Sequence, residues 1–312
     1  MDGAENHDPS TQGTWAARVS AAVRAYHEWM PIRAGATKEK NYRSFNFGDL
    51  ISLHMIDSRR QALLILTFSP PTRELLGAEQ TTWLQGQFTN SPGKWQVLGN
   101  QILMSRMEVP VSILRYLGAD GVDPNDIPLL FGAVNDYLTA KAKQAAGATL
   151  SQAEADLLDV TKNPKIGYNN DDWNGYPMAR ETVLNAAATA FSGTDKKFVV
   201  LAVDTHTSWY ADVAASGYFS GTGGLAAGTV VGKQIATPAV SSPGFEHWLP
   251  TILEAQMNQL FRGIIDDIKW MEASKRGWVM LTVTPSEVKA DWIFVGSVFE
   301  KDFTSSIAHC YD

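Results

Sequence analysis

The sequence contains little cysteine, little charge and no long apolar run. Cys310 is the single cysteine in 312 residues, which excludes an internal disulfide and a zinc site built on several cysteines. Charged residues make up 19% of the chain. No stretch approaches the ~18 consecutive apolar residues of a membrane span. We therefore expect a protein without a membrane-spanning helix.

The sequence also lacks a basic surplus and a leader. Lys and Arg number 26 against 33 Asp and Glu, a formal charge of −7, so there is no nucleic-acid-binding signature. Residues 1–7 are polar and carry no signal peptide, which predicts a cytoplasmic location for the chain as written. Gly-x-Ser-x-Gly and His-Glu-x-x-His are absent, which disfavours serine hydrolases and zincins. Nothing in the sequence indicates an oligomeric state.

The apolar residues, 45% of the chain, alternate between helical and strand patterns. Alternating helices and continuous apolar strands predict an α/β layered fold. Two short strands near the end, separated by residues 284–287, predict an antiparallel hairpin. The pattern predicts helices over 14–30, 74–88 and 177–191, and strands over 47–57, 95–104, 197–204, 278–283 and 288–295.

Residues 107–165 differ in character from the rest of the chain. They contain an Ala- and Lys-rich helix near 128–146 and a capping box, Ser151-x-x-Glu154, that opens a further short helix. We predict a mainly helical insertion at about 107–165 within a single domain that spans residues 1–312.

Asp204-Thr205-His206 follows the most sheet-like run of the chain. Ligands of open α/β sheets bind outside the carboxyl ends of strands. In an extended backbone Asp204 and His206 would project to one side, where a carboxylate and an imidazole could share a metal ion. The alternative is that Asp204 caps Thr207 or Ser208 beside a satisfied histidine.

Three further segments carry candidate chemistry. Arg59 could hold a phosphate at another strand end, or pair with Asp57. Residues 220–228 are glycine-rich but lack the Lys-Ser/Thr ending of a phosphate loop, so a flexible loop is favoured over a nucleotide site. The oxygen-rich residues 169–176 could bind calcium or form a turn before the 177–191 helix.

Nine segments together resemble the alkaline phosphatase D family, the PhoD-like metallophosphatases, in the right order and over nearly the whole chain. They are Gly3–His7, Ala25–Arg33, Tyr42–Leu50, Met55–Arg59, Leu76–Gln80 with Trp83-Leu84, Leu98–Gln101, Trp173–Pro177, Val203–Trp209 and Thr237–Gly244.

The resemblance implies a metallophosphoesterase-like sandwich of two β-sheets flanked by helices, with metals at the strand ends. It implies iron and calcium as cofactors, and hydrolysis of phosphate monoesters and diesters by a metal-activated oxygen. Asp204 and His206 match the metal ligands of the family's Gly-Asp-x-His segment. Arg59 and Asn100 are the candidates for binding the phosphate of the substrate.

The sequence departs from the family in ways that bear on activity. Val203 replaces the glycine before Asp204, and Asn174 replaces an aspartate. The family's N-terminal ligands, which include a cysteine, a tyrosine and an Asp-Asp-His-Glu stretch, have no counterpart, and Cys310 lies at the wrong end. We therefore predict an N-terminally truncated fold with an incomplete metal site and doubtful activity alone. The alternative is a non-catalytic remnant or gene fragment that acts as a binding or structural domain. Family members are typically exported.

Overall fold

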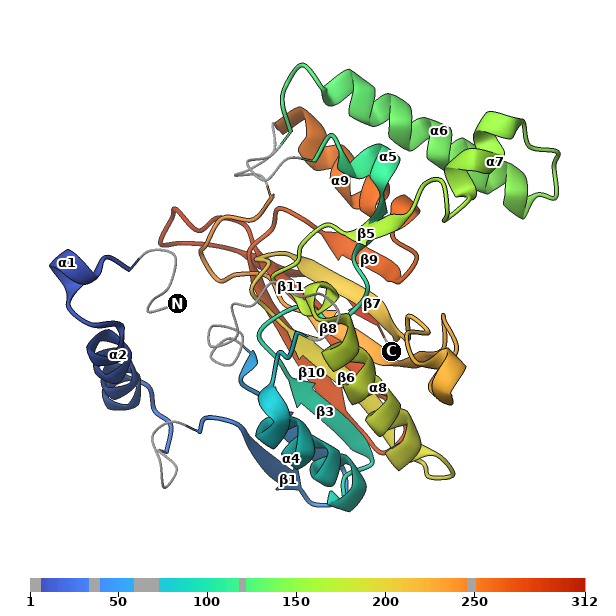
Figure 1. Cartoon of the computed structure of the whole chain (residues 1–312). Helices are drawn as coiled ribbons and strands as arrows, with labels where there is room; N and C mark the ends of the chain where they lie inside the picture. The colour runs from blue at the N-terminus through green and yellow to red at the C-terminus, as the bar shows by residue number, and fades with distance from the viewer. Residues whose placement is uncertain (1–6, 34–39, 59–72, 118–121, 246–250, 312) are drawn as a thin grey trace.

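The computed structural model describes residues 7–33, 40–58, 73–117, 122–245 and 251–311 (Figure 1). Its main sheet has seven strands in the order β1-β2-β3-β6-β8-β7-β9, and a second sheet has the order β10-β11-β12. The strands of the main sheet are β1 Arg43–Phe47, β2 Ile51–Met55, β3 Trp95–Gly99, β6 Lys197–Ala202, β7 Ser208–Ala214, β8 Val230–Ala236 and β9 Ile268–Glu272. The strands of the second are β10 Gly277–Val283, β11 Val288–Val295 and β12 Ser305–Tyr311.

Helices flank the main sheet and form most of the segment between β3 and β6. That segment also contains the strand pair β4 Glu108–Pro110 and β5 Lys165–Gly167. The helices are α1 Pro9–Gln12, α2 Trp15–Trp29, α4 Gly77–Asn90, α5 Val111–Leu114, α6 Ile127–Ala145, α7 Gln152–Leu158, α8 Pro177–Phe191 and α9 Thr251–Ile264, with the 3-10 turns η1 Trp173–Gly175 and η2 Ser220–Thr222. Within the described ranges, no helix combines the length and apolar character needed to cross a membrane.

The two faces of the main sheet bury separate apolar clusters. On one face, Val97, Val199 and Ile235 pack against Trp292 and other residues of the second sheet. On the other face, α4 and α8 cover the sheet with a cluster that includes Phe88, Leu184 and Val200. This arrangement confirms the predicted α/β sandwich of two sheets flanked by helices.

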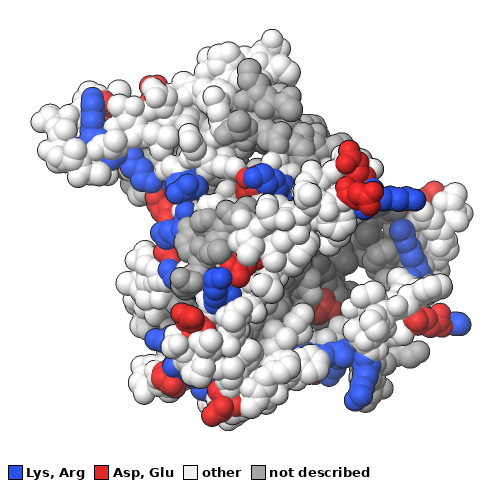
Figure 2. Space-filling view, turned by 180° about the vertical axis from the view of Figure 1, so that it is seen from behind, with Lys and Arg blue, Asp and Glu red and all other residues white. Residues whose placement is uncertain are grey.

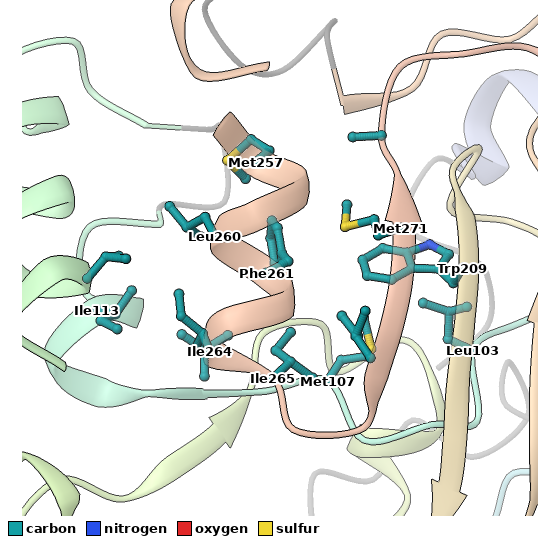
Figure 3. Close-up of a cluster of buried hydrophobic side chains, with 14 of the residues drawn as sticks. Leu103, Met107, Ile113, Trp209, Met257, Leu260, Phe261, Ile264, Ile265 and Met271 are labelled. Carbon is teal, nitrogen blue, oxygen red and sulfur yellow. The ribbon is translucent and has the colours of Figure 1, made fainter. Parts of the chain in front are cut away.

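A third cluster joins α9 to the main sheet and to the helices of the 107–165 segment. Figure 3 shows Phe261 of α9 and Ile265, the residue after α9, between Ile113 on one side and Met271 and Trp209 on the other. All five of these side chains are buried, Trp209 completely. The boundary of the predicted insertion stays a prediction, although its helices share this core with the sheet.

The strands β2, β3, β6 and β8 are parallel, so their carboxyl ends lie along one edge of the sheet. Backbone hydrogen bonds join the residues that follow them: the N–H of Asn100 donates to the carbonyl of Leu201 at 3.0 Å, and that of Thr237 to Ala202 at 3.0 Å. This carboxyl edge is where the sequence predicts the functional site.

The structure corrects several predicted boundaries. The 47–57 segment is not one strand, because a turn at Gly48, with φ of 59°, separates β1 from β2. The 95–104 strand ends at Gly99. The hairpin 278–283/288–295 forms, but it belongs to the second sheet. Strands β7, β8, β9 and β12 and helix α9 are additional elements.

Candidate functional site

Asp204 and His206 lie in a bend between β6 and β7. Both adopt left-handed backbone angles, with φ of 75° for Asp204 and 57° for His206, and they are the two non-glycine residues with positive φ in the described part of the chain. The expectation of an extended Asp-Thr-His segment is therefore wrong, because the chain turns immediately after β6. Such angles are costly for residues other than glycine and concentrate at functional sites.

Hydrogen bonds from a buried tryptophan stabilise the bend. The indole Nε1 of Trp209 donates to Thr205 Oγ1 at 3.1 Å and to Thr207 Oγ1 at 2.5 Å. The two threonines alternate with Asp204 and His206. Their anchoring to the core leaves Asp204 exposed and His206 partly exposed at the carboxyl edge.

A backbone carbonyl fixes the orientation of His206. Nδ1 of the ring lies 2.8 Å from the carbonyl oxygen of Pro243. A carbonyl can only accept, so Nδ1 carries the proton and donates. Nε2 of the neutral ring then keeps its lone pair, which is the arrangement found in metal-binding histidines.

Asn100 adds a third polar side chain to the same edge. Its side chain is 6% exposed, and its Nδ2 donates to the carbonyl of Ile102. Its Oδ1 is buried without a hydrogen-bond partner. A buried oxygen in this state is costly unless something else satisfies it, so Asn100 is a candidate ligand of a cation or substrate.

The neighbouring strand end is tied to Asn100 through Gln101. The amide of Gln101 accepts from the N–H and hydroxyl of Ser58 and donates to the carbonyl of Ile56 at 2.8 Å. The backbone of Asp57 forms two hydrogen bonds with the side chain of Gln80. The N–H of Asp57 donates to Gln80 Oε1, and Gln80 Nε2 donates to the carbonyl of Asp57. Arg59, the other predicted phosphate ligand, lies outside the described residues.

Two further residues, Tyr168 and Asp172, have raised pKa values. Burial, together with the charges of Asp172 and Asp204, raises the pKa of the Tyr168 hydroxyl. Burial also raises the pKa of Asp172 to about 7, against hydrogen bonds from Asn174 that lower it. No spacing or motif in the sequence indicates these perturbations.

The 169–176 segment forms a turn, one of the two alternatives that the sequence leaves open. Asp172 Oδ1 accepts from the backbone N–H of Asn174 at 2.7 Å and caps η1, which leads directly into α8. The side chain of Asn174, which replaces the family's aspartate, accepts from the N–H of Met107 at 3.1 Å.

The described side chains at the carboxyl edge are of types that bind metal ions, but they are too few for a complete metal site. A carboxylate, an imidazole and an amide oxygen are ligands of hard and borderline cations. Within the residues that the structure describes, no group of three or more His, Cys, Asp or Glu side chains could hold a metal ion.

The protein is thus a two-sheet α/β sandwich with polar side chains at the carboxyl ends of its parallel strands. The profile of the PhoD-like phosphatase family matches residues 1–292, and the chain belongs to this family, as the sequence motifs predict.

Two relatives support this assignment. Alkaline phosphatase D of Bacillus subtilis (strain 168) is 26% identical over 289 residues, which cover 88% of this chain and 38% of the relative. A solved structure described as "Structure of PhoD" matches 98% of this chain and 48% of its own, with a TM-score of 0.63 and 23% identity. The chain spans less than half the length of either.

Proposed function

We propose that this chain carries part of the active site of a metal-dependent phosphoester hydrolase, with Asp204 and His206 as metal ligands. The observation that carries the proposal is the strained bend after β6, where the carbonyl of Pro243 orients the imidazole of His206 through its Nδ1. Membership of the PhoD-like phosphatase family supplies the reaction class. Phosphate esters are the proposed substrates.

The residues of the chain would hold and orient the reacting groups. Asp204 would contribute a carboxylate oxygen and His206 its Nε2, while Asn100 Oδ1 would bind the same cation or the substrate phosphate. Arg59 would bind the phosphate oxygens. When bound, the metal supplies activation of the attacking oxygen and neutralisation of the charge on phosphorus.

Iron together with calcium is the proposed metal content. Calcium takes 6–8 oxygen ligands in general, and iron accepts imidazole as well as carboxylate. Asp204, His206 and Asn100 do not complete such a shell, so further ligands must come from other residues. We accordingly expect weak activity from this polypeptide by itself.

The test compares Asp204→Asn with Asp195→Asn. Asp195 lies just before β6 at the opposite end of the strand, where its side chain is 80% exposed. The protein is loaded with iron and calcium, and turnover of an aryl phosphate and the bound metal are measured. We expect Asp204→Asn to lose at least ~100-fold in turnover and to bind less metal, and Asp195→Asn to match the wild type. Equal turnover in both variants would contradict the assignment.

The same experiment distinguishes the proposed hydrolase from the alternative that the sequence leaves open, a non-catalytic binding or structural domain. That alternative requires that the purified wild-type chain take up neither iron nor calcium and hydrolyse no ester. Elemental analysis of the wild type therefore decides between the two before any variant is made.

A further inference from the structure

A cavity of about 590 Å³ opens beside Pro243. Its wall includes Pro243, whose carbonyl oxygen accepts the hydrogen bond from the imidazole of His206. The cavity is therefore one residue away from the proposed metal ligand. It is lined by Ser241, Pro243, Ser274, Lys275, Arg276, Val295, Gly296, Ser297, Val298 and Phe299.

Three segments form this cavity, and backbone hydrogen bonds connect them. The N–H of Gly277 donates to the carbonyl of Ala239 at 3.1 Å, which joins the turn before β10 to the loop that carries Pro243. The N–H of Val295 donates to the carbonyl of Arg276 at 2.9 Å, which joins β11 to that same turn. The walls are thus built on the sheet rather than on a single free loop.

The charge of the cavity is unusual for this protein. Lys275 and Arg276 line it, and no Asp or Glu is among the described residues that do. The chain as a whole has a formal charge of −7. On the face in Figure 2, by contrast, basic and acidic side chains are scattered among uncharged ones.

The ammonium of Lys275 forms one long ion pair and lies 5.5 Å from the centroid of the Phe294 ring. Its side chain is 54% exposed, and its nearest carboxylate, on Glu272, lies 3.8 Å away. The Arg276 guanidinium is partly buried and donates to the carbonyl of Ser274 at 2.5 Å. The hydroxyl groups of Ser241 and Ser297 add neutral donors, while that of Ser274 donates to Glu272 at 2.9 Å. Phe299, 96% exposed, offers an apolar surface at the same wall.

We propose that this cavity binds a second anionic group of the substrate, such as a phosphate or carboxylate carried by the alcohol part of the ester. The inference rests on the proposed function, because the scissile phosphate must occupy the carboxyl edge beside His206. It assigns Lys275 and Arg276 as specificity residues, with preference for esters that carry a second anion.

A binding measurement tests the cavity without turnover. The full chain is freed of metal with a chelator, and inorganic pyrophosphate is titrated into it by calorimetry. We expect Lys275→Gln to weaken binding about fivefold, and Lys197→Gln, at the opposite end of the sheet, to leave it unchanged. Arg276→Lys, which keeps the charge, should bind within about twofold of the wild type. No pyrophosphate binding, or equal binding by Lys275→Gln, overturns the proposal.

A kinetic measurement then tests the preference. The substrates are 4-carboxyphenyl phosphate and 4-carbamoylphenyl phosphate, which have similar shape and differ in the charge of the para substituent. We expect a several-fold lower KM for the carboxylate in the wild type, with this ratio lost in Lys275→Gln. Equal KM values in the wild type overturn the preference. If neither ester is hydrolysed, the proposed function fails, while the pyrophosphate titration still decides the cavity.

Discussion

The Arg180–Glu181 pair on α8 and the Asp204–His206 bend after β6 are both polar, and they are built in opposite ways. Arg180 is 2% exposed and Glu181 is fully buried. The guanidinium donates to Glu181 at 2.7 Å and to the carbonyls of Met104 and Ala214 at 2.6 and 2.7 Å. The bend, in contrast, has strained backbone angles and projects Asp204 into solvent.

The difference indicates that the buried pair serves the stability of the fold and the bend serves the proposed metal binding. The buried pair ties α8 to the segment after β3 and to the last residue of β7, Ala214, which lies beside Val230 at the start of β8. Its removal should cost stability, since an unpaired buried charge is expensive. Asp204 is exposed and His206 is partly exposed, so changes there should affect metal binding more than folding.

The largest effect is expected from Arg180→Met. This change leaves the Glu181 carboxylate buried without its cation and removes the donor to two carbonyls. We expect the free energy of unfolding to fall by about 3–5 kcal/mol, measured by urea denaturation. Arg24→Met is the matched control, because Arg24 pairs with Glu28 on exposed α2, and it should hardly change the stability.

The double variant Arg180→Met/Glu181→Gln sharpens this test. A glutamine at 181 carries no charge and can still accept from the N–H of Ser216, as Glu181 does at 3.0 Å. We expect it to recover part of the lost stability. If Arg180→Met is as stable as Arg24→Met, the contrast between the two regions is wrong.

The next effect concerns Asp172 and pH. Because its pKa in the folded protein is raised to about 7, the folded state binds a proton that the unfolded state has lost above pH ~4. Stability should therefore fall as the pH rises from about 4 to about 7, by an amount on the order of 4 kcal/mol.

Asp172→Asn isolates this contribution. The amide mimics the protonated acid and keeps an oxygen for the backbone N–H of Asn174. Urea denaturation at pH 4 and pH 8 should show the variant close to the wild type at the lower pH and more stable than it at the higher pH. A constant difference between the two proteins at both pH values would contradict the raised pKa.

The sequence predicts the layers of this fold better than the details of its site. The helix at 177–191 and the strand at 197–204 are recognisable because apolar residues repeat with clear periods. β8 escapes detection because Gly232, Lys233 and Gln234 interrupt its pattern. Asp204 and His206 are predicted from their place after an apolar strand and from the match to a family motif. The left-handed backbone angles of both residues, and the hydrogen bond from His206 to Pro243, 37 residues away, are set by tertiary structure.

The smallest effect tests the strain in the bend. Because Asp204 has φ of 75°, alanine should fit poorly there and glycine well, which reverses the usual order in which alanine is the more stable. We expect Asp204→Gly to exceed Asp204→Ala by about 1 kcal/mol in free energy of unfolding, with metal binding lowered in both. At Asp195, where the backbone is not left-handed, the same pair of substitutions should not favour glycine. If alanine is preferred at both positions, the bend is not strained at Asp204, and the contrast with α8 reduces to burial alone.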